Sequence, residues 1–438
     1  MKMLIEPSIF SGEICAPLSK SSGQRYLLMC LSQERVQIED LGDDADTQAV
    51  LAVLKQLPLE IEEKEGKVTI SSKWVVNKEN IGTWKDEIKM EVGESGFALR
   101  SLVFLLPLYS KRVEIRLQKS LKNRDFSEMQ QLLALLDLQY ERKEDIIIIS
   151  GELSWKKVFE IETIPDVSSS QYVSGLLILI AHLSQWGVID INNLVLNFNS
   201  IPSMPYVMQT MEHLKNTELA FIELRGKTFS FKNGIQKLEK KVKIERDWSG
   251  ASFLFAAAVK TNSEVVIRNL DLFSKQADKK ILEVLQNIGL HLSIELEKIT
   301  IRKTEKRSAF HVDLTDAPDL FPALAVIAST CKGRSVLEGV HRLKNKESDR
   351  AFAIVESFNK LGISVDIQDD LMLIIGGESK GGLVESYGDH RMAMALSILA
   401  AHGIKQIELD SSEVIRKSYP DFFIHMQSLG MQYSEVKE

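Results

Sequence analysis

The sequence predicts an α/β fold made of six copies of one repeat, in two groups of three. Three observations support this prediction. A polar turn leads six times into a largely apolar helix, a strand and an amphipathic helix follow, and a short strand hairpin generally closes the repeat. The six turns lie at residues 17–25, 92–100, 166–171, 247–252, 316–319 and 387–391.

The first helix of the repeat has almost no polar face. Residues 253–259, 323–328 and 392–401 are examples. A helix that is apolar on all sides is buried on all sides. We therefore expect helices inside and sheets outside, which inverts the usual layering of α/β proteins.

The second helix is amphipathic instead. In residues 207–214, 281–289 and 352–362, apolar residues recur every three or four positions. Several of these helices end in Leu-Gly or Ile-Gly, which is a C-cap signal. An alternating strand and its hairpin partner follow, as at 363–367 and 371–375.

The length of 438 residues favours two or three domains. We place residues 17–242 in one domain and residues 1–16 with 243–438 in the other. The boundary lies near the charged stretch that starts at Glu239, which shows no core pattern. If the first strand pairs with the C-terminal half, the chain crosses between the domains twice.

Composition excludes several classes of protein. A net charge of -7 argues against nucleic-acid binding. Cys15, Cys30 and Cys331 have neither metal nor disulfide spacing, which fits a reducing compartment. The apolar run 173–181 is too short to span a bilayer, and the chain begins with a strand pattern instead of a leader. We expect a cytoplasmic monomer without membrane contact.

The polar turns carry most of the chemically notable residues. A helix N-terminus offers free N–H groups and a positive dipole end, which suit anions. Lys20, Ser21 and Arg25 follow the first turn, and the Gly-rich second turn contains Gly96. Taken alone, each turn is also explained by a capped helix with solvated charges.

Two later clusters are denser. Lys346, Glu347 and Arg350 lie within about one helical turn, although an exposed ion-pair run would look the same. His390 and Arg391 precede a wholly apolar helix, which packing does not explain. Because such groups recur at equivalent points of the repeat, we predict a substrate rich in phosphate or carboxylate.

In order and spacing, seven motifs resemble those of the enolpyruvyl transferases, in particular the 5-enolpyruvylshikimate-3-phosphate synthases (3-phosphoshikimate 1-carboxyvinyltransferases). They cover nearly the whole chain. The motifs are Ser-Lys-Ser at 19–21, Gly-x-x-Gly-x-x-x-Arg at 93–100, Ser-Ser-Gln at 169–171, Pro-Asp at 318–319, Lys-Glu-x-x-Arg at 346–350, Gly-Asp-His-Arg at 388–391 and Lys-x-x-Pro at 417–420. The resemblance implies a two-domain inside-out α/β barrel of six βαβαββ repeats.

The resemblance also implies substrate contacts, mainly with shikimate 3-phosphate in the 17–242 domain and with phosphoenolpyruvate in the other. Shikimate 3-phosphate would contact Lys20, Ser21, Arg25, Ser169, Ser170, Gln171, Ser203, Tyr206, Asp319, Arg342 and Lys346. Phosphoenolpyruvate would contact Lys20, Gly96, Arg124, Gln171, Glu347, Arg350, Arg391 and Lys417, with His390 nearby.

The implied reaction moves the enolpyruvyl group of phosphoenolpyruvate to the 5-hydroxyl of shikimate 3-phosphate, on the way to chorismate and the aromatic amino acids. It proceeds by addition and elimination, and requires no metal or organic cofactor. Asp319 is the candidate base for the hydroxyl. Glu347 is the candidate acid and base at C3, and Lys20 carries a proton or acts electrostatically.

Some positions depart from the family pattern. Glu94 stands where asparagine is usual, and Phe97 where threonine is usual. Glu94 pairs with Lys20 or Arg100, or else points away. Arg342 replaces an asparagine, and Asp125 a proline.

Two other functions remain as alternatives. The sister enzyme that acts on UDP-N-acetylglucosamine uses a loop cysteine, and no cysteine lies near Arg124 here. A non-catalytic descendant would bind ligands without turnover, but the joint presence of Lys20, Asp319, Glu347 and Arg391 argues against it.

Overall fold

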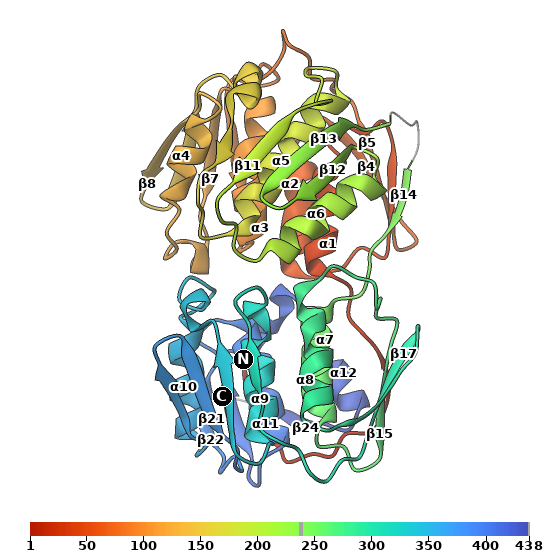
Figure 1. Cartoon of the computed structure of the whole chain (residues 1–438), viewed down its shortest axis with the longest axis vertical. Coiled ribbons are helices and arrows are strands. Elements are labelled where there is room, and N and C mark those ends of the chain that lie inside the picture. The colour runs from red at the N-terminus through yellow and green to blue at the C-terminus, as the bar shows by residue number, and fades with distance from the viewer. Residues whose placement is uncertain (236–239, 437–438) are drawn as a thin grey trace. The chain divides into compact units, whose positions relative to one another are not determined.

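The computed structural model describes residues 1–235 and 240–436, and the chain forms two compact units. Unit 1 comprises Met1–Ser19 and Glu245–Glu438, and unit 2 comprises Lys20–Ile244 (Figure 1). No helix in the described part of the chain is long and apolar enough to cross a membrane.

Six four-stranded sheets confirm the predicted repeat. In each sheet one edge strand is parallel to its neighbour and the remaining neighbours are antiparallel, as in β6-β7-β9-β8. Three sheets use consecutive strands. These are β6 (Ile88–Glu91), β7 (Arg112–Arg116), β8 (Gln139–Lys143) and β9 (Ile146–Ser150); β10 (Thr163–Ile164), β11 (Val195–Phe198), β12 (Ala220–Arg225) and β13 (Thr228–Asn233); β18 (His311–Asp313), β19 (Arg334–Glu338), β20 (Val365–Gln368) and β21 (Leu371–Ile375).

The other three sheets are each completed by a strand from a distant part of the sequence. β1 lies between β23 and β24, β2 pairs with β15, and β14 pairs with β3. The chain therefore passes between the units after β2 and again after β14. The strands are β1 (Lys2–Glu6), β22 (Gly382–Glu385), β23 (Ile407–Asp410) and β24 (Gln432–Val436); β2 (Gly12–Cys15), β15 (Glu264–Arg268), β16 (His291–Ile294) and β17 (Lys298–Arg302); β14 (Lys240–Lys243), β3 (Val36–Glu39), β4 (Leu59–Lys64) and β5 (Lys67–Ser72).

The charged stretch near 239–243 corrects one expectation. Lys240–Lys243 is strand β14 with alternating burial, whereas the sequence suggested no core pattern; Glu239 lies outside the described residues. A lysine fills an interior position because its ammonium donates to the carbonyl of Thr217 and lies 3.6 Å from Glu218. The sequence therefore did not show the alternation of buried and exposed residues, because one buried position is a lysine whose charge has partners inside the fold.

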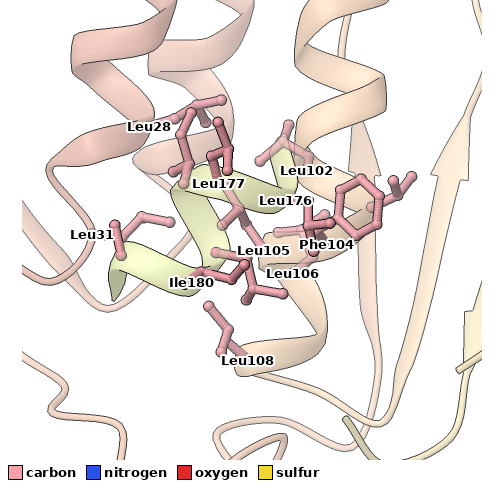
Figure 2. Close-up of a cluster of buried hydrophobic side chains, with 14 of the residues drawn as sticks. Leu28, Leu31, Leu102, Phe104, Leu105, Leu106, Leu108, Leu176, Leu177 and Ile180 are labelled. Carbon is pink, nitrogen blue, oxygen red and sulfur yellow. The ribbon is translucent and has the colours of Figure 1, made fainter. Parts of the chain in front are cut away.

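The inner helices are buried as predicted. Every residue of α3, α7, α9 and α11 is buried. Side chains from α1, α3 and α5 interlock in unit 2, as Figure 2 shows for Leu28, Leu102 and Leu177. Gly175 permits this packing, because a β-carbon there would lie 2.8 Å from the Cα of Ser101. The inner helices are α1 (Lys20–Met29), α3 (Gly96–Leu105) and α5 (Ser170–Gln185) in unit 2, and α7 (Trp248–Ala258), α9 (Phe321–Ser329) and α11 (His390–Ala401) in unit 1.

The second helices bury one face, as their periodicity predicts. In α10, Ile354 and Phe358 are buried whereas Phe352 is exposed. These helices are α2 (Ala45–Leu54), α4 (Glu128–Ala134), α6 (Met204–Asn216), α8 (Ile281–Asn287), α10 (Arg350–Lys360) and α12 (Phe422–Ser428). Short 3-10 helices lie at η1 (Leu106–Leu108), η2 (Lys119–Leu121), η3 (Trp155–Glu160), η4 (Ala277–Lys280), η5 (Pro318–Leu320), η6 (Val340–Arg342) and η7 (Ser412–Lys417).

Candidate active site

The predicted site residues form two groups, one in each unit, near the N-termini of inner and neighbouring helices. We call them the unit 2 half-site and the unit 1 half-site. The unit 2 half-site contains Lys20, Ser21, Arg25, Gly96, Arg124, Ser169, Ser170, Gln171, Ser203 and Tyr206. The unit 1 half-site contains Asp319, Arg342, Lys346, Glu347, Arg350, His390, Arg391 and Lys417.

Arg25 joins α1 to α6 in the unit 2 half-site. Its Nε donates to the Thr210 hydroxyl at 2.8 Å, and its Nη2 donates to the carbonyl of Tyr206 at 3.3 Å. Ser21 on the same helix turn donates to Gln209 of α6 at 3.3 Å. These contacts bring Ser21, Arg25 and Tyr206 together, as the motif resemblance requires.

Phe97 supports Arg25 from α3. The guanidinium carbon lies 4.4 Å from the centre of the Phe97 ring, which is the geometry of a cation–π contact. Both side chains are buried. The phenylalanine that departs from the family pattern is therefore packed against a predicted substrate-binding arginine.

Gly96 is surrounded by polar groups from three segments. A β-carbon at this position would lie 2.8 Å from Arg100 Nη1, 2.9 Å from Arg124 Nη1 and 3.6 Å from Gln171 Oε1. Arg100 also donates to Gln171 Oε1 at 2.8 Å. Only glycine leaves this space open, so the predicted Gly96, Arg124 and Gln171 do lie together.

Lys20 faces carboxylates on α2. Its ammonium lies 3.1 Å from Asp46 Oδ2. Asp44, the N-cap of α2, accepts from the Thr47 amide at 2.9 Å. Burial raises the pKa of Asp44 to about 7, against the attraction of Lys20. Asp44 is therefore partly protonated at neutral pH.

The predicted serines occupy helix starts. Ser169 is the N-cap of α5 and accepts from the amide of Gln171 at 3.3 Å, and Ser170 follows it. Ser203 is the N-cap of α6 and has a left-handed backbone with φ 53°. The serines therefore lie next to the first N–H groups of α5 and α6, and anions are favoured at such helix N-termini.

Arg350 is the centre of the unit 1 half-site. Its side chain is fully buried and donates to three carboxylates, each at 2.7 Å: Asp319, Glu347 and Asp389. Burial opposes its charge, but these three carboxylates together raise the pKa of Arg350 above its usual value. One guanidinium therefore fixes both predicted acid–base residues.

Cations surround Asp319 in addition to Arg350. Lys346 Nζ and Arg391 Nη2 each lie 3.2 Å from an Asp319 oxygen. Burial alone would raise the pKa of Asp319, but Arg391, Lys346 and Arg350 hold that pKa well below its usual range. Asp319 is consequently ionised in this half-site.

Glu347 and Arg391 each have a further partner. Lys417 Nζ lies 3.3 Å from Glu347 Oε1. Arg391 donates to the hydroxyl of Ser249 at 2.7 Å. Ser249 belongs to the turn at 247–252, which contributes no residue to the predicted site, and this contact brings that turn into the half-site.

Arg342 and His390 lie at the edge of this network. Burial lowers the pKa of Arg342, while attraction by Asp316 and Asp319 opposes this effect. His390 is fully buried, with its Nδ1 3.7 Å from Asp389 Oδ1. Both predicted residues therefore sit near the carboxylates that Arg350 organises.

Glu94 contacts the segment after β7. Its carboxylate lies 3.0 Å from the Lys119 ammonium and accepts from the Ser120 hydroxyl at 3.1 Å. The sequence offered Lys20 or Arg100 as partners, or a carboxylate that points away, because it could not show that η2 approaches this turn.

Sequence reasoning missed Asp389 and Ser249 as site residues, and it placed Arg100 in the motif at 93–100 without assigning it a substrate. Asp389 belongs to the Gly-Asp-His-Arg string and is fully buried. Arg100 stands one turn after Gly96, which is a detectable signal. Ser249 carries no such signal, because its partner Arg391 is distant in sequence.

The comparisons with known proteins agree with the motifs. The family description "EPSP synthase (3-phosphoshikimate 1-carboxyvinyltransferase)" matches residues 5–426. The chain belongs to this family. The 3-phosphoshikimate 1-carboxyvinyltransferase of Brachyspira hyodysenteriae is 31% identical over 98% of this chain and 99% of its own. That of Methanosarcina acetivorans is 31% identical over 100% of both chains.

A solved structure of EPSP synthase from Acinetobacter baumannii superimposes with a TM-score of 0.79 at 20% identity, and covers 100% of both chains. It confirms the inside-out α/β fold. The chain is a transferase with the reaction of its family, the transfer of the enolpyruvyl group from phosphoenolpyruvate to shikimate 3-phosphate.

Proposed function

We propose that this transfer to the 5-hydroxyl proceeds by addition and elimination, with the roles that follow for the residues of the two half-sites. The hydroxyl oxygen attacks C2 of phosphoenolpyruvate while C3 gains a proton, which gives a tetrahedral ketal phosphate. C3 then loses a proton and the bond between C2 and the phosphate oxygen breaks, which releases inorganic phosphate. The observation that carries this proposal is the pair Asp319 and Glu347, both held by Arg350.

Asp319 is the proposed base for the 5-hydroxyl, and Glu347 the proposed acid and base at C3. Both carboxylates are held by an arginine that is itself immobilised by Asp389. Fixed orientation of acid–base groups lowers the barrier for proton transfer. Lys20 acts as a proton carrier or an electrostatic partner, since Asp46 keeps its ammonium in place.

Cations of the unit 1 half-site bind phosphoenolpyruvate in this proposal. Arg350, Arg391 and Lys417 would meet its carboxylate and phosphate, to which guanidinium groups bind in bidentate fashion. In the structure these cations are paired with Asp319 and Glu347. An anionic substrate would compete for the cations, and the pKa of each carboxylate would rise. Substrate binding would thereby make both carboxylates stronger bases.

The unit 2 half-site binds mainly shikimate 3-phosphate. Hydroxyl groups of Ser169, Ser170 and Ser203 and the guanidinium of Arg25 suit a phosphate and a polyol ring. Gly96, Arg124 and Gln171, which lie together, would serve phosphoenolpyruvate. In the unit 1 half-site, Lys346 and Arg342 would add contacts to the shikimate side.

A phosphate-release assay with both substrates tests the proposal. We expect phosphate release only when shikimate 3-phosphate and phosphoenolpyruvate are both present. Rapid quenching should trap a tetrahedral intermediate that carries the carbon atoms of both substrates. Binding of both substrates without any phosphate release would instead identify a non-catalytic ligand-binding protein.

A further inference from the structure

A cavity of about 300 Å³ lies in unit 1 at the C-terminal ends of the inner helices. Its wall includes Lys260, just after α7, Ser329 at the end of α9, and His402 at the end of α11. The unit 1 half-site lies at the N-terminal ends of α9 and α11. With 12 residues, α11 separates its two ends by roughly 18 Å. The cavity is therefore a separate feature from the candidate active site.

Positive charge predominates in the wall of the cavity. Lys260, Arg307 and Lys332 line it, together with one acid, Glu378. Burial lowers the pKa of Lys260, and repulsion by Arg307 adds to this effect against the attraction of Glu378. An anion in the cavity would offset the repulsion between the two cations.

Helix ends hold these cations in position. Lys260 Nζ donates to the carbonyl of His402 at 2.6 Å. Arg307 donates to the carbonyl of Val259 through Nη1 at 3.0 Å and to that of Thr330 through Nε at 3.3 Å. Capping of the helix C-termini thus fixes these two cations, and neither forms an ion pair with a carboxylate among the described residues. Lys332 is exposed and makes no ion pair within the described part of the chain.

Two residues that line the cavity, Ser379 and His402, each have a buried polar atom without a hydrogen-bond partner among the described residues. Within residues 1–235 and 240–436, neither Ser379 Oγ nor His402 Nδ1 has a hydrogen bond, although only 2% of Ser379 and 5% of His402 is exposed. His402 Nε2 lies 3.1 Å from the carbonyl of Ala257 and must donate to it. Burial lowers the pKa of His402 to about 3, so Nδ1 carries a lone pair. A buried polar atom without a hydrogen bond destabilises the folded chain.

We propose that this cavity binds a small oxyanion that carries a hydroxyl group, either hydrogen phosphate or a hydroxy-carboxylate. The anionic oxygens would accept from Lys260, Lys332 and the Ser379 hydroxyl. The hydroxyl group of the ligand would donate to His402 Nδ1. A ligand of this class would form hydrogen bonds with both unpartnered atoms and would compensate the excess positive charge of the wall. Its binding is independent of the reaction in the half-sites.

The test measures the ¹⁵N resonance of His402 Nδ1 in the full chain labelled with ¹⁵N-histidine, assigned with His402→Gln. Inorganic phosphate at pH 8 should shift this resonance in a saturable manner. Sulfate has a similar charge but no hydroxyl group, and should bind at least 5-fold more weakly. Malate, which carries a hydroxyl group, and succinate, which lacks one, repeat this comparison for carboxylates. The tighter binder of phosphate and malate identifies the kind of oxyanion that the cavity takes.

Matched variants separate the cavity from general surface charge. Lys332→Gln should weaken binding of the better ligand at least 5-fold, and Ser379→Ala should weaken it as well. Lys306→Gln removes an exposed lysine outside the cavity wall and should leave binding unchanged. An unshifted His402 resonance with both phosphate and malate would overturn the proposal. Equal binding of the hydroxyl-bearing and hydroxyl-free anions, or equal effects of Lys332→Gln and Lys306→Gln, would overturn it too.

Discussion

The two half-sites hold their arginines in different ways. In the unit 2 half-site, Arg25 rests on the Phe97 ring and Arg100 donates to the amide oxygen of Gln171. In the unit 1 half-site, Arg350 is surrounded by three carboxylates. Neutral acceptors leave most of the charge of an arginine available to a ligand, whereas carboxylates compensate it.

This difference teaches how one repeated framework serves two purposes. We propose that the unit 2 half-site binds a polyol phosphate with an arginine that the Phe97 ring positions. The unit 1 half-site stores its charge in ion pairs that an anionic substrate would rearrange, which couples substrate binding to the basicity of Asp319 and Glu347. Each of the following predictions tests one side of this comparison.

The largest expected effect is on stability. Arg350→Met would leave Asp319, Glu347 and Asp389 without their shared partner, and we expect a loss of about 3–5 kcal/mol in the free energy of unfolding. Arg100→Met removes a buried arginine that donates to neutral oxygens. We expect it to cost only about 1 kcal/mol per lost hydrogen bond. Urea denaturation measures both variants, and equal losses would refute the contrast.

The next effect is on turnover. Asp319→Ala and Glu347→Ala should each lower kcat by about 100-fold or more, because general acid–base groups contribute this much. Circular dichroism should show that the fold survives. Glu356→Ala removes an exposed carboxylate of α10 and serves as the control with unchanged kcat. Near-normal turnover in either site variant would exclude the assigned role.

A third prediction concerns pH. The pKa of Asp44 is raised to about 7 in the folded chain, so between pH 5 and 7 the folded state binds a proton that the unfolded state releases. The contribution of Asp44 to stability therefore falls as pH rises, by about 2–3 kcal/mol between pH 5 and pH 8. Asp44→Asn keeps an N-cap and should remove this loss. Identical pH profiles of unfolding for both proteins would contradict the prediction.

The smallest expected effect concerns Phe97. Phe97→Leu should raise KM for shikimate 3-phosphate by up to about 30-fold with kcat unchanged, because a cation–π contact between buried groups contributes about 2 kcal/mol. Phe97→Tyr keeps an aromatic face and should restore KM. Phe126→Leu removes the ring beneath Arg100 instead, and should act on KM for phosphoenolpyruvate. An unchanged KM for shikimate 3-phosphate in Phe97→Leu would show that Phe97 only fills the core.

Much of the fold could be predicted because its signals are local. The apolar helix at 392–401 and the hairpin at 371–375 follow from residue spacing, and both occur as α11 and β21. Strand β14 was missed because Lys240 is stabilised by residues at 217 and 218, which no local window contains. The pairing of β2 with β15 and of β14 with β3 has the same long-range character.

By itself, the sequence determined the six repeats and the helix starts, since periodicity and capping act between near neighbours. Its motifs, through their resemblance to a known family, implied most of the candidate site residues. Only the tertiary structure decided the partners. It placed Arg350 among three carboxylates, Phe97 beneath Arg25, and Ser249 against Arg391. The physical reason is that ion pairs and ring contacts depend on distances between segments far apart in the chain, which folding alone sets.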